Sequence, residues 1–251
     1  MKTGQPVELN PETAAEAYLA LLASRDVDYL FGNSGTDFPP LVEALAKGRA
    51  LGWQMPEPII VPHENVGVAM AHGYYMVTGR PQAMMVHVGL GTANSINGIF
   101  NAARQNIPIL FTAGRTPITE GGLLGSRNNY INWAQEQFDQ GGMLREFVKW
   151  DYELRHPSQI ESVVDRALAI AKSEPCGPVY LTLPREVLAA DIGTTKIGSR
   201  TTIAPISPPS AAPDTPHPVA TPPGNAHTPH TITPKSAPTP RSPPSPTAQP
   251  P

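Results

Sequence analysis

The sequence predicts an α/β fold in which a parallel sheet of about six strands carries helices on both faces. Short apolar runs alternate with longer helical segments between residues 1 and 190, the order that produces parallel βαβ units. The runs are almost continuously apolar, as expected for strands that helices cover on both sides. Three of them end in polar loops, which emerge at one edge of such a sheet.

The first helix is expected over residues 13–24. Asn10 would be its N-cap, Pro11 its first helical residue and Glu12 an acid in the first turn. Apolar residues then recur at helical spacing, at Ala17, Leu21 and Leu22.

The remaining elements follow from the same alternation. Strands are expected at residues 29–31, 59–61, 83–86, 107–111, 147–150 and 178–183. Helices are expected at residues 40–46, from Glu64 onward, at 95–105 and at 158–172. The segment 116–142 is long and rich in Gly and Asn, which is typical of a functional loop or an interface.

Composition excludes several classes of protein. The net charge of −3 does not favour binding to nucleic acid or to an anionic membrane. The single cysteine, Cys176, allows no internal disulfide, and we expect a buried, inert thiol in a reducing compartment. The longest apolar runs are strand-sized, and the N-terminus lacks the apolar core of a signal peptide. We therefore expect a soluble, cytoplasmic protein.

The composition changes sharply near Ala190. Of 31 prolines, 17 lie in residues 191–251, and no Phe, Trp or Tyr follows Tyr180. Such a segment buries too little apolar surface to offset its ordering entropy. We therefore expect a folded domain at residues 1–190 and a disordered, Pro-rich tail at residues 191–251.

Three strand-end loops hold the candidate functional residues. They are GNSGT at residues 32–36, HEN at 63–65 and HVGLGTAN at 87–94, and in a parallel sheet they can converge on one ligand. Taken alone, each has a structural explanation: Glu64 as an acid at a helix N-terminus, His87 as a core histidine, and Asn33 and Thr36 as turn residues. GLGTAN resembles a dinucleotide fingerprint, but the third glycine and the acid expected further on are missing.

Four ordered blocks together resemble thiamine-diphosphate-dependent enzymes. They are FGNSGTDFPPLVEAL, PHENVGVAMAHGYYMVTGRP, HVGLGTANSINGIFNAARQNIPILFTAG and GPVYLTLP. The resemblance covers about residues 8–190 and is greatest to the N-terminal pyrimidine-binding domain of the acetolactate synthase, pyruvate oxidase and benzoylformate decarboxylase group. It implies the thiamine-diphosphate-binding fold and chemistry on a 2-oxo acid.

The resemblance also implies roles for individual residues. Glu64 matches the glutamate that hydrogen-bonds N1′ of the cofactor's aminopyrimidine and thereby activates the cofactor. His87 matches an active-site histidine of benzoylformate decarboxylase relatives, where most acetolactate synthases carry a small hydroxylated residue. Thr36 matches a substrate-contacting serine. The implied cofactor-binding residues are Asn33, Ser34, Gly35, Glu64, Gly89, Gly91 and Asn94.

The sequence departs from the family in two places. Ser34 stands where a proline usually precedes Gly35. The family's glutamine block has no clean equivalent, because the register of Ala134-Gln135-Glu136-Gln137 is uncertain, and we assign no role to it.

The chain is much shorter than its relatives, which continue with a central domain and a C-terminal domain that holds Mg²⁺ and the diphosphate. No GDG block occurs here, so the Mg²⁺ ligands are expected on a missing domain, as would be any FAD site. The abrupt tail is what a frameshift would produce; an evolved tail is the alternative. We expect a module that is inactive or nearly so alone, and that forms a homodimer or binds a partner subunit supplying the diphosphate domain.

A second hypothesis is a non-catalytic, dimerising scaffold. Its tail contains PxxP matches at residues 205–208 and 240–243, a pattern that SH3-like domains bind. Whether the family chemistry here is that of a synthase, a decarboxylase or an oxidase, and which 2-oxo acid is the substrate, stays open.

Overall fold

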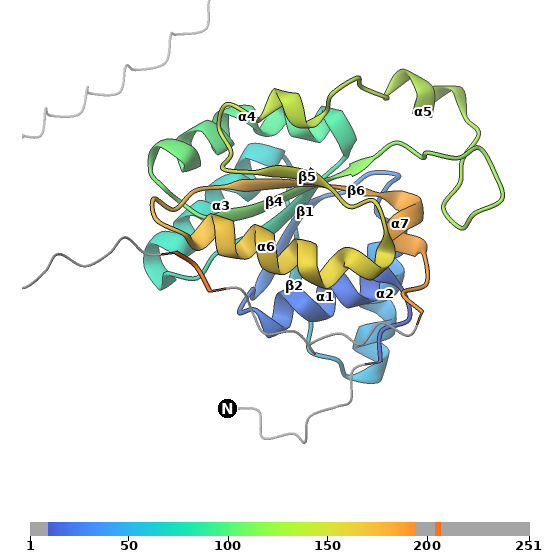
Figure 1. Ribbon diagram of the computed structural model, residues 1–251, viewed down its shortest axis with the longest axis horizontal. Coiled ribbons are helices and arrows are strands. Elements are labelled where there is room, and N and C mark those ends of the chain that lie inside the picture. Colours follow the sequence, from blue (N-terminus) through green and yellow to red (C-terminus); the bar gives the residue numbers. More distant parts are fainter. Residues whose placement is uncertain (1–9, 194–203, 207–251) are drawn as a thin grey trace, which may run out of the picture. The chain divides into compact units, whose positions relative to one another are not determined.

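The computed structural model describes residues 10–193 and 204–206. Its centre is a six-stranded sheet in the order β2-β1-β3-β4-β6-β5 (Figure 1). Every neighbouring pair is parallel, which confirms the predicted fold class. The strands are β1 (Tyr29–Asn33), β2 (Glu57–Ile60), β3 (Gln82–Val86), β4 (Ile109–Arg115), β5 (Asp151–Glu153) and β6 (Val179–Pro184).

Helices cover both faces of the sheet (Figure 1). One face carries α1 (Ala14–Ser24), α2 (Pro39–Leu51), α6 (Ile160–Lys172) and α7 (Arg185–Ala189). The other face carries α3 (Glu64–Thr78) and α4 (Val88–Arg104). Shorter turns complete the described chain, namely α5 (Tyr130–Ala134), η1 (Gly141–Met143) and η2 (Pro157–Gln159).

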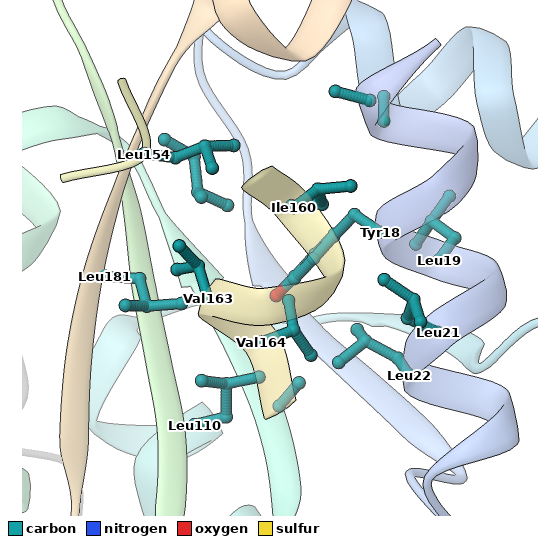
Figure 2. Close-up of a cluster of buried hydrophobic side chains, with 14 of the residues drawn as sticks. Tyr18, Leu19, Leu21, Leu22, Leu110, Leu154, Ile160, Val163, Val164 and Leu181 are labelled. Atoms are coloured by element: carbon teal, nitrogen blue, oxygen red, sulfur yellow. The ribbon is translucent and has the colours of Figure 1, made fainter. Parts of the chain in front are cut away.

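The larger apolar cluster lies between α1, α6 and the sheet. Figure 2 shows Tyr18 reaching from α1 toward Ile160 and Val164 of α6, with Leu181 and Leu110 of the strands beyond them. All of these side chains are fully buried. This cluster excludes water from most of one face of the sheet, and its hydrophobic burial is the main stabilising contribution there.

The predicted start of the first helix and the predicted strand at residues 147–150 are wrong. The N-cap of α1 is Thr13 instead of Asn10, because the Thr13 side chain accepts a hydrogen bond from the Glu16 backbone N–H at 3.3 Å. Thr13 also bridges to Asp191, which holds the helix start against the chain after β6. Residues 147–150 form the end of a turn and an irregular segment instead of a strand, and β5 begins at Asp151. The apolar Phe147 packs edge-on against Phe100 of α4, so its hydrophobicity serves a helix contact.

Helix α4 begins at Val88, seven residues before the predicted start. Gly89 and Gly91 disfavour a helix by intrinsic propensity, which is why a loop is predicted there. In the fold, a Cβ at Gly91 would lie 2.6 Å from Cβ of Val86, so the helix approaches β3 more closely than a larger residue permits. Tertiary packing therefore overrides propensity. Helix α2 likewise extends beyond the predicted 40–46, and α7 follows Pro184 where no element is predicted.

Contacts of the domain continue past Ala190. Ile192 is buried in the α1–α6 cluster, and its N–H donates to the Glu12 carbonyl at 2.9 Å. The Ile206 carbonyl accepts from the Glu174 N–H at 3.0 Å. The PxxP match at 240–243 lies outside the described residues, as do residues 207 and 208 of the match at 205–208 and all of the predicted disordered tail except 191–193 and 204–206.

Cys176 is half-buried instead of buried. Its thiol donates to the Lys172 carbonyl at 3.3 Å, and burial raises the pKa of the thiol above its ordinary value. Since the thiolate is the nucleophile, the raised pKa agrees with an inert cysteine. Among the described helices, none is long and apolar enough to cross a membrane.

Candidate functional site

The three predicted loops all emerge at the carboxyl edge of β1, β2 and β3. In the sheet, β1 lies between the other two strands, and Asn33 at its end pairs with Val86. The Asn33 side chain donates from Nδ2 to the Val61 carbonyl at 3.0 Å, which ties the end of β1 to the chain leaving β2. Asn33 therefore has a structural partner at the place where ligands bind in open α/β sheets.

Glu64 is the first residue of α3 and is only 6% exposed. His63 caps the helix by accepting from the Asn65 N–H at 3.2 Å, which fixes the direction in which α3 leaves β2. Asn94 of α4 donates from Nδ2 to Glu64 Oε2 at 3.1 Å. The structure thus brings together two of the predicted residues, one from each helix of this face. No described side chain donates to Glu64 Oε1, which leaves this oxygen for a further contact.

His87 lies at the start of α4 with 18% of its side chain exposed. Its Nδ1 lies 2.7 Å from Asp37 Oδ1, and Asp37 is 3% exposed. The other carboxylate oxygen of Asp37 accepts from the Val88 N–H at 3.2 Å. This pair ties the loop after β1 to the end of β3, so the first and third predicted loops meet.

Two glycines make room for the Asp37–His87 pair. A Cβ at Gly35 would lie 2.1 Å from His87 Nδ1, and a Cβ at Gly114 would lie 1.8 Å from Asp37 Oδ2. Real Cβ atoms do not approach so closely, so a side chain at either position would displace the ring or the carboxylate. Gly35 thus packs on His87 in this structure.

The other predicted residues divide by exposure. Ser34 and Thr36 are exposed at the same edge and are accessible to a ligand. Gly89 and Gly91 are buried in the first turns of α4 instead of forming the predicted turn, and the Gln137 side chain covers Gly89. No group of three or more His, Cys, Asp or Glu side chains within the described ranges could hold a metal ion.

Sequence reasoning assigned no role to Asp37 or Gln135. Gln135 Nε2 lies 3.3 Å from His87 Nε2, so both ring nitrogens of the histidine have a polar neighbour. Asp37 stands directly after Thr36, in the first of the three loops, and this proximity was the available signal. Gln135 lies in the long segment 116–142, within the four residues whose register with the family's glutamine block is uncertain, and it meets His87 only in three dimensions.

A buried polar network fastens α4 behind the site. The Tyr180 hydroxyl lies 2.7 Å from Thr92 Oγ1 and accepts from Gln140 Nε2 at 2.8 Å. Gln140 also donates to the Gly114 carbonyl at 2.9 Å. Burial raises the pKa of Tyr180 to about 12, so its hydroxyl stays protonated. The network fixes the start of α4, and with it His87, relative to β4 and β6.

Comparison with known proteins identifies this domain. The family described as "Thiamine pyrophosphate enzyme, N-terminal TPP binding domain" matches residues 12–143. The acetolactate synthase large subunit of Parasynechococcus marenigrum is 29% identical over 179 residues, 70% of this chain and 27% of that protein. The benzoylformate decarboxylase of Pseudomonas aeruginosa is 25% identical over 173 residues, 69% of this chain and 30% of that protein.

A solved structure agrees on the fold. The crystal structure of benzoylformate decarboxylase from Polynucleobacter necessarius superposes with a TM-score of 0.63 at 24% identity, covering 76% of this chain and 33% of that one. The chain thus spans less than a third of the two curated relatives named above. Because the family match covers more than half of its residues, the chain belongs to the thiamine pyrophosphate enzymes, of which it contains the N-terminal TPP-binding domain.

Proposed function

We propose that the edge formed by β1, β2 and β3 binds the aminopyrimidine of thiamine diphosphate, with Glu64 as its central contact. Membership of the family supports this, and the observation that carries it is the buried carboxylate of Glu64 at the start of α3. Asn94 holds Oε2 of that carboxylate and leaves Oε1 for a ring nitrogen. The other proposed contacts are Asn33, Ser34, Gly35, Gly89 and Gly91.

The residues present fit such a group. A carboxyl group that is mostly shielded from water shares a proton with a ligand nitrogen more readily than an exposed one does. Of the proposed contacts, Ser34 is exposed, whereas Gly91 acts by letting α4 lie close to β3 and Gly89 makes room for the Gln137 side chain. The cofactor, when bound, supplies the electron sink for decarboxylation of a 2-oxo acid. The chain's own part is to orient the aminopyrimidine and to hold a proton at Glu64.

We propose that His87 and Thr36 face the substrate. Both lie at the carboxyl edge of the sheet, and the Thr36 side chain is exposed there. A histidine near neutrality exchanges protons with a reacting group, which suits a decarboxylase. The named relatives include an acetolactate synthase and a benzoylformate decarboxylase. His87 favours the decarboxylase chemistry for this chain.

We further propose that this chain forms half of a complete site. The part of the relatives that it lacks would supply the Mg²⁺ and diphosphate contacts, either from a partner subunit or from a separate domain. Helix α3 offers a surface for a second copy. Its outward side carries apolar or small residues three and four positions apart, all exposed: Val66, Ala69, Met70, Gly73, Met76 and Val77. Such a continuous apolar stripe is typical of a helix that packs against a partner.

Calorimetric titration of the chain with thiamine diphosphate and Mg²⁺ tests the cofactor site. We expect weak binding, since only half of the contacts are present, and at least a tenfold loss in Glu64→Gln, about 1.4 kcal/mol. Glu43→Gln, an exposed glutamate on α2, is the matched control and should bind as the native chain does. Binding that is equal in Glu64→Gln and the native chain would contradict the assignment of Glu64.

A further inference from the structure

We infer that Asp37 is a positioning residue that keeps His87 in a single tautomer, with the proton on Nδ1 and the lone pair on Nε2. The inference rests on the proposed function in one respect only, namely that the Nε2 lone pair would face the proposed substrate. The tautomer itself is a property of the chain alone. It follows from three contacts on two side chains and from the packing around them.

The first step concerns the donors that surround Asp37. Its Oδ1 lies 2.7 Å from His87 Nδ1, and its Oδ2 accepts from the Val88 N–H at 3.2 Å. An ionised carboxylate only accepts hydrogen bonds. His87 Nδ1 must therefore carry a hydrogen, and in the neutral ring this leaves Nε2 as the acceptor.

The second step concerns His87 Nε2. Among the described residues, its polar neighbour is Gln135 Nε2 at 3.3 Å, an amide nitrogen that can donate but not accept. Donation from Gln135 requires a lone pair on Nε2, the same tautomer that Asp37 requires. Gln135 is half-exposed, so a substrate can replace it at this nitrogen.

The third step concerns how firmly the pair is held. Gly35 lies against the imidazole and Gly114 against the carboxylate, so each group packs closely on backbone that has no side chain. Val88 has a φ of +31°, which is unfavourable for a β-branched residue. Such a backbone persists only where its surroundings over-determine it, and the bond from its N–H to Asp37 is one of those constraints. The pair is therefore preorganised before any ligand binds.

The chemical consequence is that His87, at the start of α4, presents Nε2 as a proton acceptor. Nε2 takes a proton from a reacting group, the ring becomes an imidazolium, and the negative charge of Asp37 stabilises it. A buried carboxylate acts on the catalytic histidine of serine proteases in the same way, and its replacement by asparagine there imposes the wrong tautomer. The same hydrogen-bonding argument predicts the effect of replacing Asp37 by asparagine.

Asp37→Asn is the discriminating substitution because it preserves shape. The Val88 N–H needs an acceptor, so the Asn oxygen faces it and the Asn NH₂ faces His87 Nδ1. His87 must then accept at Nδ1 and hold its proton on Nε2. The substitution should invert the tautomer instead of merely loosening the ring.

The experiment is ¹⁵N NMR of the imidazole nitrogens in the full chain without cofactor, well above the ordinary histidine pKa of about 6.5. His87→Gln assigns the signals. In the native chain we expect Nδ1 to resonate as a protonated nitrogen and Nε2 as an unprotonated one, and the two to exchange in Asp37→Asn. Asp28→Asn, whose carboxylate instead binds Tyr74 and Arg80, is the matched control and should leave His87 unchanged.

Glycine variants provide a second test should Asp37→Asn fail to fold. Gly35→Ala and Gly114→Ala should abolish the single tautomer, whereas Gly73→Ala, where a Cβ meets nothing within 4 Å, should preserve it. A proton on Nε2 in the native chain, or a tautomer that stays the same in all of these variants, would overturn the inference. Either result would leave the proposed role of Glu64 unaffected. Conversely, a chain with the expected tautomer that binds no thiamine diphosphate would overturn the proposed function alone.

Discussion

The two faces of the sheet are held in different ways. On the α1–α6 face, helix α1 is surrounded: every residue from Ala14 to Leu22 is buried, with α2, α6 and α7 around it. On the α3–α4 face, the helices bury one side only. There Met70, Met76 and Val77 of α3 and Leu90 and Phe100 of α4 are exposed.

The contacts between the helices and the sheet also differ between the two faces. The α1–α6 face is closed by hydrocarbon packing, with the ring of Tyr18 at its centre (Figure 2). Beneath α3 and α4, a second buried apolar cluster is joined by polar contacts: Tyr180 with Thr92 and Gln140, and His87 with Asp37. Apolar packing therefore stabilises both faces of the sheet, and the α3–α4 face adds the polar contacts that hold the site. Hydrocarbon packing tolerates small rotations, whereas directional hydrogen bonds fix the side chains that a ligand would meet.

The largest expected effect is a truncation in the apolar cluster of the α1–α6 face. Leu21→Ala removes a fully buried side chain of α1 and should lower the free energy of unfolding by about 2–5 kcal/mol, through lost burial and a cavity. Met76→Ala on α3, where the side chain is 66% exposed, should change it by no more than about 0.5 kcal/mol. Urea denaturation followed by circular dichroism measures both. Equal losses of stability in the two variants would contradict the difference in burial between Leu21 and Met76.

An intermediate effect is expected where polar contacts hold α4. Tyr180→Phe should cost about 1–3 kcal/mol at pH 7, because Thr92 and Gln140 each lose a buried partner. Tyr130→Phe, where the side chain is 83% exposed, should cost nothing measurable.

The same variant has a pH signature. Burial raises the pKa of Tyr180 to about 12, above the ordinary value of about 10. A group with a raised folded-state pKa contributes stability below its unfolded pKa and loses it as the pH rises through the folded one. The native chain should therefore lose stability between about pH 10 and 12 faster than Tyr180→Phe does. The difference in free energy of unfolding between the native chain and the variant should narrow over this range. A constant difference in alkaline urea titrations would contradict this.

The smallest effect on folding is expected on the outward side of α3. Val77→Lys, at a position 87% exposed, should change the free energy of unfolding by less than about 0.5 kcal/mol. If α3 packs against a second copy, the same change should weaken self-association at least tenfold, about 1.4 kcal/mol, because a charge would enter an apolar contact. Val42→Lys on α2, at a position 54% exposed, should leave association unchanged. Sedimentation velocity measures the self-association of both variants. An equal effect of Val77→Lys and Val42→Lys would contradict the assignment of α3 as the interface.

The sequence by itself determined the fold class, the positions of five of the six strands and the edge of the sheet where the candidate residues lie. Apolar runs such as residues 107–111 and 178–183 predict buried strands because a strand covered on both faces has no polar side. It also placed Glu64 correctly at the start of a helix, since the chain turns at Pro62 directly after an apolar run. These are local patterns, and local physics suffices for them.

Only the tertiary structure decided what depends on close approach. Gly89 and Gly91 disfavour a helix by propensity, but both lie in the first turns of α4, where Gly91 packs against Val86 and Gly89 against Gln137. Phe147 belongs to an apolar run yet lies in a turn against Phe100 instead of in a strand. The pairing of Asp37 with His87 spans fifty positions of chain, and the approach of Gln135 to the same ring spans forty-eight. No periodicity records such contacts, because they arise when separate strand ends meet at one edge and the glycines beside them leave room.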